Sequence, residues 1–530
     1  MKRDNDSLEI KPATGHNDDS QEPMLQRNFS VVSVLGACVS LMATWEAICS
    51  TMAAGLIAGG TNSLVYGFIV AFIGTVCTAV SFSEAASMFP SAGGQYTFVA
   101  QLAPPHLRRA LSYITGWISV FAWIVFTASA PFLAGTMIQG QAVLNYESYE
   151  PQRWQGTLIY WAVLLIALPI NVFGQRILPW IEILSMILHV GLFFVLLIAM
   201  LVLSPAKQSA EAVFATFENN SGWQNDGVAW FIGLLSSSYV LAGYDAATHL
   251  SEEIAENPAV GVPVAIVGSI LINGVVGFSF LIAILFSTQD FDLALASPTG
   301  FPILEIFRQT TRGSVAGATA MSSAIVLMAT LATIPLMATA ARMVWAFSRD
   351  QGLPWSSGLS KIPESESLRV PLASILVITV ILMLLGLLNI ASTAAFNAIL
   401  GVSVVGLYIS YLIPLVLLLY QRVARPKELN WGPWRLNNVL GCVVNCVAII
   451  YTTVASIFSL FPPTQPVTAE NMNYASVVLA GAIVISGIYW LAEGHKSFHG
   501  PAAETIHGVQ REAQGLHCLP TSEDKGALAA

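Results

Sequence analysis

Apolar runs long enough to span a membrane alternate with short polar breaks along most of the chain. A helix needs about 20 mainly apolar residues to cross the hydrocarbon core of a bilayer. Twelve runs come near or exceed that length: 31–57, 64–89, 112–139, 157–173, 179–203, 228–250, 262–287, 314–341, 371–389, 393–420, 437–461 and 475–492. Only FGQRILP separates the fourth run from the fifth, so eleven or thirteen spans remain alternative counts. The pattern predicts an all-α membrane protein with about 12 transmembrane helices.

Composition supports a protein whose surface faces lipid. Of the 530 residues, 55% are hydrophobic and only 10% are charged, whereas a soluble domain carries roughly a quarter charged residues. The net charge of -9 argues against a nucleic-acid partner, because such proteins present a basic surface. Cys442 and Cys446 lie four residues apart, but no further Cys or His completes a set of metal ligands. We therefore expect no metal and no cofactor.

The basic residues predict the orientation of the spans. Lys and Arg accumulate in cytoplasmic loops. If the N-terminus is cytoplasmic, eighteen of the 22 basic residues fall in inside loops or tails, none falls within a span, and the outside loops hold Arg153, Lys207, Arg308 and Arg312. Residues 1–30 and 493–530 are predicted to be disordered cytoplasmic tails that flank a membrane domain at 31–492. The loops are too short for a catalytic domain and carry no HExxH or GxSxG pattern, so an enzyme is not expected.

Six ionisable residues lie within the predicted spans, where each needs a partner or a task because burial in lipid is costly. They are Glu46, Glu84, Glu182, His189, Asp245 and His249. All are candidates for lining a cavity. Glu84 and Glu182 are placed near span ends, where a purely structural role is an equal alternative.

Spans 1 and 6 are rich in small and hydroxyl-bearing residues, which weaken a helix. Span 1 contains Gly36, Ser40 and Thr44 in its middle, and span 6 contains three serines before Gly243. Secondary transporters bind solutes where such helices unwind near the membrane midplane. Close packing of helices is the alternative reading. The two spans are five helices apart, which favours two inverted five-helix repeats.

Four stretches resemble a known family: SEAASMFPSAGGQYTFVAQLAP, FGQRILPWIE, GYDAATHLSEEIAENPAVGVPVAI and ARMVWAFSRDQGLPW. With them the chain resembles the amino acid–polyamine–organocation superfamily, most closely its fungal branch of choline, GABA and amino acid permeases. The resemblance implies a leucine-transporter-like fold with a 5+5 inverted repeat. Spans 1–5 (about 31–203) and spans 6–10 (about 228–420) would form the repeats, and spans 11–12 (about 437–492) would be peripheral.

The same resemblance implies a substrate site between broken spans 1 and 6. Carried over by position, the two breaks are Cys38, Val39, Ser40, Leu41, Met42 and Ala43 in span 1, and Val240 to Asp245, with Gly243, in span 6. Aromatic gating suggests Tyr239 and Tyr244, with Trp117 or Trp123 as weaker candidates. Asp245 would attract a substrate ammonium group.

Proton-coupled relatives carry a lysine in span 5, and here His189 lies near that position while no span contains a lysine. Because histidine titrates near neutral pH, a proton is favoured over sodium as the coupling ion, and a structural His189 is the alternative. Glu46 departs from the family pattern; it would pair with a substrate ammonium if it faces the cavity, or be a solvated rim charge if it faces outward.

The motifs on the inner side suggest a gate. Arg342 and Arg349 can form ion pairs with Glu252 or Glu253, and such pairs would lock the inner gate while the outside is open. Alternatively, the two arginines only mark the cytoplasmic side.

These observations predict a secondary active transporter that moves a small amine-bearing solute (amino acid, GABA, choline or polyamine) by alternating access, with proton coupling. The plasma membrane is the location expected from the family. A solute-sensing receptor without net flux is the alternative.

Overall fold

Every predicted span forms helix in the computed structural model, which describes residues 25–365, 368–391, 394–469 and 471–501. Span 1 begins with α1 (Val31–Met42) and continues into α2 (Thr44–Met88). The chain changes direction at Gly59 and Gly60, which are not helical, so α2 consists of two helical halves and the second half is span 2. Gly60 has φ 65°, a conformation that glycine adopts without steric cost. The reversal brings Gly55 against the side chain of Leu64.

The remaining spans follow in the predicted order. The spans before span 6 and their connections are α3 (Gln95–Leu102), α4 (Pro105–Asn145), α5 (Arg153–Phe173), α6 (Leu178–Leu203) and α7 (Ala210–Phe214). Span 6 is divided into α8 (Asp226–Gly233), α9 (Leu235–Val240) and α10 (Ala246–His249), followed by the 3-10 turn η1 (Ser251–Glu253).

The second half of the chain contains longer uninterrupted helices. It comprises α11 (Pro258–Ser287), α12 (Phe291–Leu295), α13 (Pro302–Thr310), α14 (Val315–Arg349), α15 (Ser356–Leu359), α16 (Leu372–Gly386), α17 (Leu388–Ala391), α18 (Ala394–Ala424), α19 (Asn438–Phe458), α20 (Ala475–Tyr489), the π-turn η2 (Trp490–Gly494) and α21 (His495–Ser497).

Ten helical segments of the described chain are long and apolar enough to cross a membrane. Ten segments correspond to twelve predicted spans, because one segment contains two spans and one span is not counted. The first segment, Val31–Met88, has 58 residues and contains spans 1 and 2. Span 6 is not among the ten because its breaks leave only short helices.

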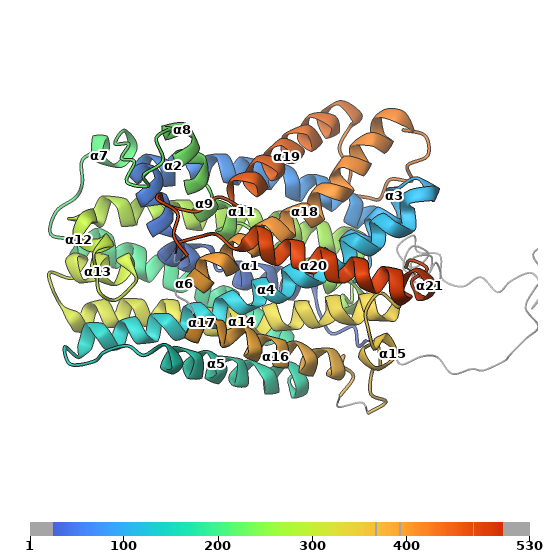
Figure 1. Ribbon diagram of the computed structural model, residues 1–530, viewed down its shortest axis with the longest axis horizontal. Coiled ribbons are helices and arrows are strands. Elements are labelled where there is room, and N and C mark those ends of the chain that lie inside the picture. The colour runs from blue at the N-terminus through green and yellow to red at the C-terminus, as the bar shows by residue number, and fades with distance from the viewer. Residues whose placement is uncertain (1–24, 366–367, 392–393, 470, 502–530) are drawn as a thin grey trace, which may run out of the picture.

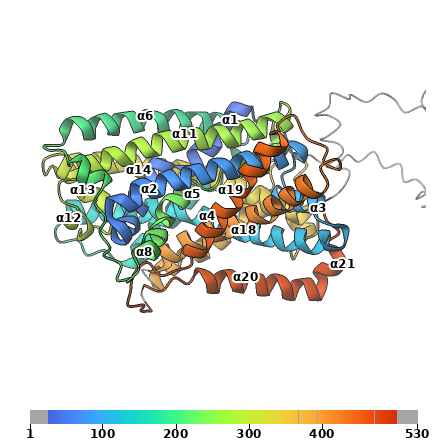
Figure 2. The same ribbon diagram turned by 90° about the horizontal axis from the view of Figure 1, so that it is seen from above.

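The long helices run side by side along the longest axis of the molecule (Figure 1). The short helices α3, α15 and α21 lie at one end of this bundle, called here the α3 end, and α7, α12 and α13 lie at the other, the α7 end. The helices α6 and α20 lie on opposite edges of the bundle, and α1 lies beside α6 (Figure 2).

The edge helices carry the exposed apolar side chains that a lipid contact requires. On α6 these include Phe194, Val195 and Val202, and on α20 they include Val484 and Ile488. Large exposed apolar surfaces are rare on soluble monomers, and a closed helical bundle satisfies its own backbone hydrogen bonds inside a membrane. The all-α membrane fold predicted from the sequence is confirmed.

The packed part of the chain is longer than the predicted membrane domain. The backbone N–H of Phe29 donates to the carbonyl of Glu253 at 3.0 Å, so the fold begins before residue 31. At the other end, Phe498 is fully buried and Arg109 donates to the carbonyls of His495 and Phe498. The rest of the predicted tails, 1–24 and 502–530, lies outside the described residues.

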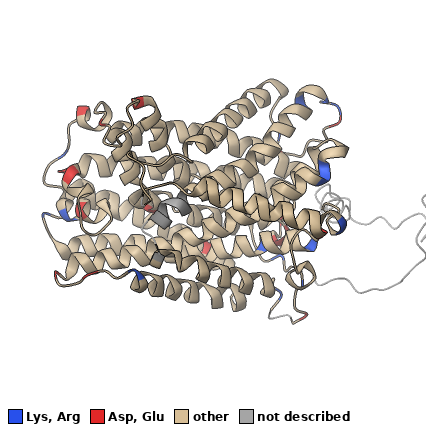
Figure 3. Ribbon diagram, in the orientation of Figure 1, with Lys and Arg blue, Asp and Glu red and all other residues tan. Residues whose placement is uncertain are grey.

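Most of the basic residues in the described part of the chain lie at the α3 end (Figure 3). Two of the basic residues, Arg342 and Arg422, are buried inside helices. Both α14 and α18 extend past the predicted span ends, to Arg349 and Ala424. Each buried arginine is neutralised by a buried carboxylate, Glu253 for Arg342 and Glu84 for Arg422.

Candidate functional site

The interruption of span 1 is confined to one residue. Ala43 has φ 41° and ψ 49°, the left-handed conformation that non-glycine residues rarely adopt. The predicted break at Cys38–Ala43 is therefore too long, because Cys38–Met42 remain helical. Backbone hydrogen bonds explain the difference: the N–H of Ala43 still reaches the carbonyl of Val39 at 3.3 Å, and that of Ala47 reaches the carbonyl of Ala43 at 2.8 Å.

The interruption of span 6 covers residues 241–245, between α9 and α10. It was predicted one residue too early, because Val240 is the last residue of α9. Gly243 has φ 98°, and a Cβ there would lie 2.7 Å from Cε1 of Phe126 and 2.9 Å from Cδ1 of Leu41. Only glycine fits this position without strain.

A cavity lies beside the break in span 1, and we call it the central cavity. Its walls come from α1, α2, α4, α9 and α14, and its lining residues are Leu41, Met42, Ala43, Glu46, Ala47, Phe126, Ser129, Ala130, Leu133, Tyr239, Ala329, Ala332 and Leu336. Five of the predicted substrate-binding residues are among them: Leu41, Met42, Ala43, Glu46 and Tyr239. The lining is mostly apolar, with Glu46 as its one acidic side chain.

The other predicted residues of the span 1 break lie outside this lining. The Cys38 thiol is directed at the carbonyl of Tyr244, 3.8 Å away. The Ser40 hydroxyl donates to Glu182 at 3.2 Å and to the carbonyl of Gly36 at 2.8 Å. Val39 is buried in the helix packing. These side chains hold α1 in place instead of facing a solute.

Tyr239 separates the central cavity from a second one toward the α7 end. It lines both, and the second cavity is otherwise formed by α2 around Ser50, by α8 and α9, and by the α19–α20 connection at 461–473. The Tyr239 hydroxyl donates to Ser129 on α4 at 2.7 Å. Its position and hydrogen bond fit the predicted gating aromatic. Tyr244 instead packs against Phe82 and Tyr411.

Glu46 and His189, which were singled out for separate roles, form one buried pair. Nδ1 of His189 lies 2.8 Å from Oε1 of Glu46, and both side chains are fully buried. The second oxygen of Glu46 has no hydrogen-bond partner within the described part of the chain. Trp45 fixes the backbone beside the pair by donating to the carbonyl of His189 at 3.2 Å. Glu46 is therefore no solvated rim charge.

Asp245 lies in a hydrogen-bond network and not on the central cavity. Oδ1 accepts from the Tyr411 hydroxyl at 2.5 Å, and Oδ2 accepts from Gln95 at 2.6 Å and Trp123 at 3.0 Å. Nε2 of His249 lies 3.5 Å from Oδ2. The carboxylate is thus committed to protein donors in this conformation. The other weaker gating candidate, Trp117, donates to the carbonyl of Gly352 at the α3 end, 3.1 Å away.

The four predicted gate residues form two ion pairs at the α3 end. Arg349 forms a bidentate pair with Glu252, with N–O distances of 2.8 and 2.9 Å. Arg342 forms a second pair with Glu253, fully buried. Burial alone would raise the pKa of Glu252, but the Arg349 guanidinium and the N–H of Ala92 lower it below its ordinary value. Beside these pairs, Tyr96 donates to Asp350 at 2.7 Å.

Glu84 and Glu182 have structural contacts. Glu84 pairs with Arg422 at 2.5 Å and accepts from the backbone of Leu436 at 2.7 Å. It thereby ties the end of α2 to α18 and to the linker that follows. The guanidinium of Arg422 also stacks over Trp431, 4.4 Å from the ring centroid.

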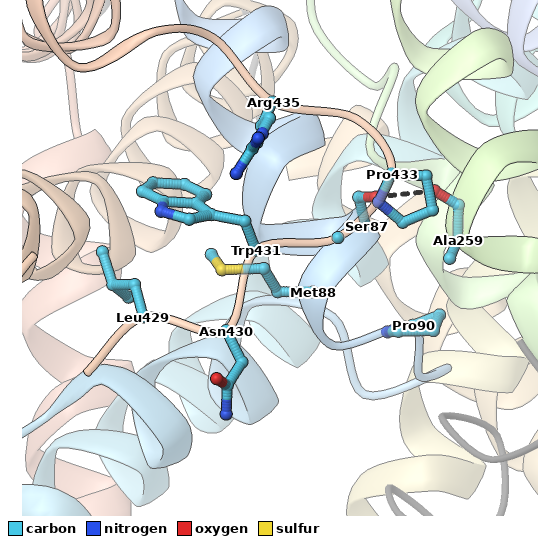
Figure 4. Close-up of a pocket in the computed structure, with 10 residues that line it drawn as sticks. Ser87, Met88, Pro90, Ala259, Leu429, Asn430, Trp431, Pro433 and Arg435 are labelled. Carbon is cyan, nitrogen blue, oxygen red and sulfur yellow. Dashed lines mark hydrogen bonds between the residues drawn. The ribbon is translucent and has the colours of Figure 1, made fainter. Parts of the chain in front are cut away.

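That linker borders a groove at the α3 end (Figure 4). Residues 429–433 and Arg435 line it opposite Ser87, Met88, Pro90 and Ala259. Ser87 donates to the carbonyl of Ala259 at 2.7 Å and accepts from the N–H of Trp434 at 3.1 Å. The groove shares no lining residue with the central cavity, so we do not assign it to the solute site.

Several site residues were missed by the sequence reasoning. Gln95 lies in the first of the four family motifs, but no role was predicted for it. Its side chain reaches Asp245. Ser129 and Tyr411 belong to no sequence motif. Their contacts with span 6 become evident only from the packing of α4 and α18 against it.

A bundle of membrane-spanning helices with a cavity beside interrupted spans defines a class, the membrane permeases. The comparisons with known proteins identify the family within this class. The model of the amino acid permease family matches residues 29–485, and the chain belongs to this family. The family predicted from the four sequence motifs is confirmed.

Curated relatives are similar over almost the whole chain. A choline transporter of Saccharomyces cerevisiae is 34% identical over 93% of this chain and 85% of its own length. The amino-acid permease BAT1 of Arabidopsis thaliana is 29% identical over 91% of this chain and 94% of its own length. The polyamine transporter TPO5 of Saccharomyces cerevisiae is 29% identical over 93% of this chain and 81% of its own length. These relatives are permeases and transporters, not enzymes.

Proposed function

We propose that this protein is a secondary active transporter that moves a small amine-bearing solute across a membrane by alternating access, with a proton as the coupling ion. The solute classes are those named for its relatives, choline, amino acids and polyamines, together with GABA. The solute occupies the central cavity, which measures only about 20 Å³ in this conformation, so its walls must move apart to admit the solute.

The observation that carries this proposal is the free oxygen of Glu46. Oε2 is buried and has no hydrogen-bond partner among the described residues, and Glu46 is one of the residues that line the central cavity. A buried carboxylate oxygen without a partner is costly. A solute ammonium group would satisfy it, while the apolar walls from Leu41, Leu133 and Leu336 would contact the carbon skeleton.

His189 is the proposed coupling residue. Its imidazole lies within hydrogen-bond distance of the other oxygen of Glu46, so protonation of the imidazole places a positive charge beside the carboxylate. Because the imidazole and the ammonium group share one carboxylate, proton occupancy and solute affinity are coupled. Histidine titrates in the range where cellular proton gradients operate.

Alternating access requires a barrier on each side of the cavity. Tyr239 and its bond to Ser129 supply the barrier toward the α7 end. The ion pairs of Arg349 and Arg342 supply the barrier toward the α3 end. The gathering of basic residues at the α3 end (Figure 3) supports a cytoplasmic location of that end and of both termini. The proposed membrane is the plasma membrane, the location expected from the family.

Uptake into proteoliposomes tests the proposal. Radiolabelled choline, GABA, spermidine and a neutral amino acid are offered to the reconstituted protein with and without an inward proton gradient. A parallel series replaces the proton gradient with a sodium gradient. We expect accumulation of at least one solute, stimulated by the proton gradient and abolished by an ionophore that collapses it. Binding of a solute without accumulation under any gradient would overturn the transport proposal in favour of a sensor.

A further inference from the structure

We propose that Asp245 and His249 form a second proton-binding site, and that the proton they share holds the α3 end closed. The inference rests on the proposed transport function only in treating the α3 end as a gate. The proton site itself follows from the hydrogen-bond geometry around His249.

The first nitrogen of His249 must carry a hydrogen. Nδ1 lies 2.8 Å from the backbone carbonyl of Ala92, and a carbonyl oxygen can only accept. In a neutral imidazole, the other nitrogen, Nε2, then bears a lone pair and is an acceptor. Nothing else in the described chain donates to Nε2.

The second nitrogen faces an acceptor. Nε2 lies 3.5 Å from Oδ2 of Asp245, and both side chains are fully buried. This oxygen already accepts from Gln95 and Trp123, so it acts as an acceptor toward its neighbours. A neutral His249 would turn a lone pair toward a carboxylate in a medium of low polarity. One additional proton converts this repulsive contact into an ion pair.

Among the described residues, no neighbouring cation supplies the missing charge. Toward the pair, α4 presents Trp123 and α3 presents Gln95. The α18 helix presents Tyr411, and α1 presents the Cys38 thiol. Around the turn η1, Arg349 and Arg342 are each bound to a glutamate, Glu252 and Glu253. Glu182 on α6 is a further acid near Cys38, and α11 contains no titratable residue.

The same proton is connected to the closed α3 end through the loop between α2 and α3. Ala92 of this loop accepts from His249 with its carbonyl, and its N–H donates to Glu252 at 3.2 Å. Gly94 has φ 55°, and a Cβ there would lie 2.8 Å from Thr248 Oγ1 and 3.0 Å from Cε1 of His249. The loop is thus fitted around His249, and loss of the proton would weaken its attachment to span 6.

Labelling of Cys38 measures the opening of this end without any solute. Cys38 is fully buried on the α3 side of the span 1 break, against Tyr244. The full-length protein is prepared with every other cysteine replaced by alanine, at positions 49, 77, 442, 446 and 518. N-ethylmaleimide labelling is followed from pH 5.5 to 8.5, and each rate is divided by that of the protein unfolded in detergent at the same pH. This ratio removes the pH dependence of thiol reactivity.

We expect the normalised rate to rise with pH, by at most about tenfold per pH unit, the limit for one linked proton. His249→Gln should abolish the rise. Asp245→Asn should also give a flat profile, because it removes the negative charge that binds the shared proton. His106→Gln is the matched control: His106 is exposed at the start of α4, and its variant should keep the rise.

A flat normalised profile in the otherwise unchanged protein would overturn the proposal, as would a His249→Gln variant that keeps the rise. The first of these outcomes is measured with His249 and Asp245 both intact, so it does not depend on whether their variants fold. If uptake of every solute fails while the pH-dependent labelling is present, the transport proposal is overturned and the proton site stands.

Discussion

The imidazole of His189 and the carboxylate of Glu46 share a hydrogen bond of 2.8 Å in a fully buried setting between α6 and α2. Only one oxygen of the carboxylate takes part in this bond; the other has no hydrogen-bond partner among the described residues, and Glu46 is one of the residues that line the central cavity. One acidic group therefore connects a titratable base to the place where a solute would bind.

Replacing Glu46 by Gln tests whether its charge recognises the solute. The amide keeps the size of the side chain but removes the negative charge. A charge-assisted hydrogen bond contributes about 1.5–3 kcal/mol, so we expect KM for the transported cationic solute to rise roughly ten- to a hundredfold. Initial uptake rates over a range of solute concentrations measure this change.

Glu147→Gln is the matched control, because Glu147 is exposed in the connection after α4. It should leave KM unchanged. An unaltered KM in Glu46→Gln would contradict the assignment of Glu46 to the ammonium group.

Removing the hydroxyl of Tyr239 tests the barrier toward the α7 end. Tyr239→Phe loses the bond to Ser129 but keeps the ring between the two cavities. A hydrogen bond of this kind contributes about 0.5–1.5 kcal/mol, so a cysteine placed at Leu133 in the central cavity should be labelled about 2- to 10-fold faster. The labelling is measured with a charged, membrane-impermeant thiol reagent, in protein whose native cysteines are replaced.

A cysteine at Ser50 provides the control, since Ser50 lines the cavity toward the α7 end and not the central one. Its labelling rate should not respond to Tyr239→Phe. Equal rates at position 133 with tyrosine and with phenylalanine would show that the hydroxyl is no part of the barrier.

The spans could be predicted from the sequence because twenty-residue apolar runs have few other uses. The length of the span 1 break could not. Whether a helix unwinds over six residues or one depends on which carbonyls remain within reach, and at Ala43 both flanking hydrogen bonds survive. Small side chains indicate where a helix can break, but the tertiary contacts determine how far.

The assignment of chemistry to Asp245 shows a second limit. An acid at the break of span 6 is a reasonable ligand for an ammonium group, and the sequence contains nothing against it. In the structure, both oxygens accept hydrogen bonds, from Tyr411, Gln95 and Trp123. These three donors come from three other helices. Contacts over more than a hundred residues leave no local pattern, so a buried network and a solute ligand cannot be told apart from sequence.

The ion pair of Glu252 with Arg349 should make stability depend on pH in the acid range. The pKa of Glu252 is lowered from an ordinary value of 4.5, so the pair contributes fully above that value and is lost as pH falls through the lowered one. We expect the protein to melt at a higher temperature than Glu252→Gln near neutral pH, with a difference that shrinks below about pH 4.5. Thermal unfolding in detergent between pH 3 and 7 measures it. A difference that grows on acidification would contradict the pairing.

Gly243 offers the sharpest test of the span 6 break. Alanine there would have to adopt φ 98° and would place its Cβ against Phe126 and Leu41. Backbone strain of this kind costs about 1–3 kcal/mol, and the contacts add to it, so Gly243→Ala should lower the melting temperature and remove most of the uptake. Gly191→Ala is the matched control, because Gly191 lies inside α6 and no atom lies within 4 Å of the place that an alanine methyl group would occupy. Alanine is favoured over glycine in a helix by about 0.5–1 kcal/mol, so this variant should melt at the same temperature or higher and transport normally. A Gly243→Ala protein that matches the Gly191→Ala protein in both measurements would show that span 6 does not need this conformation for its function.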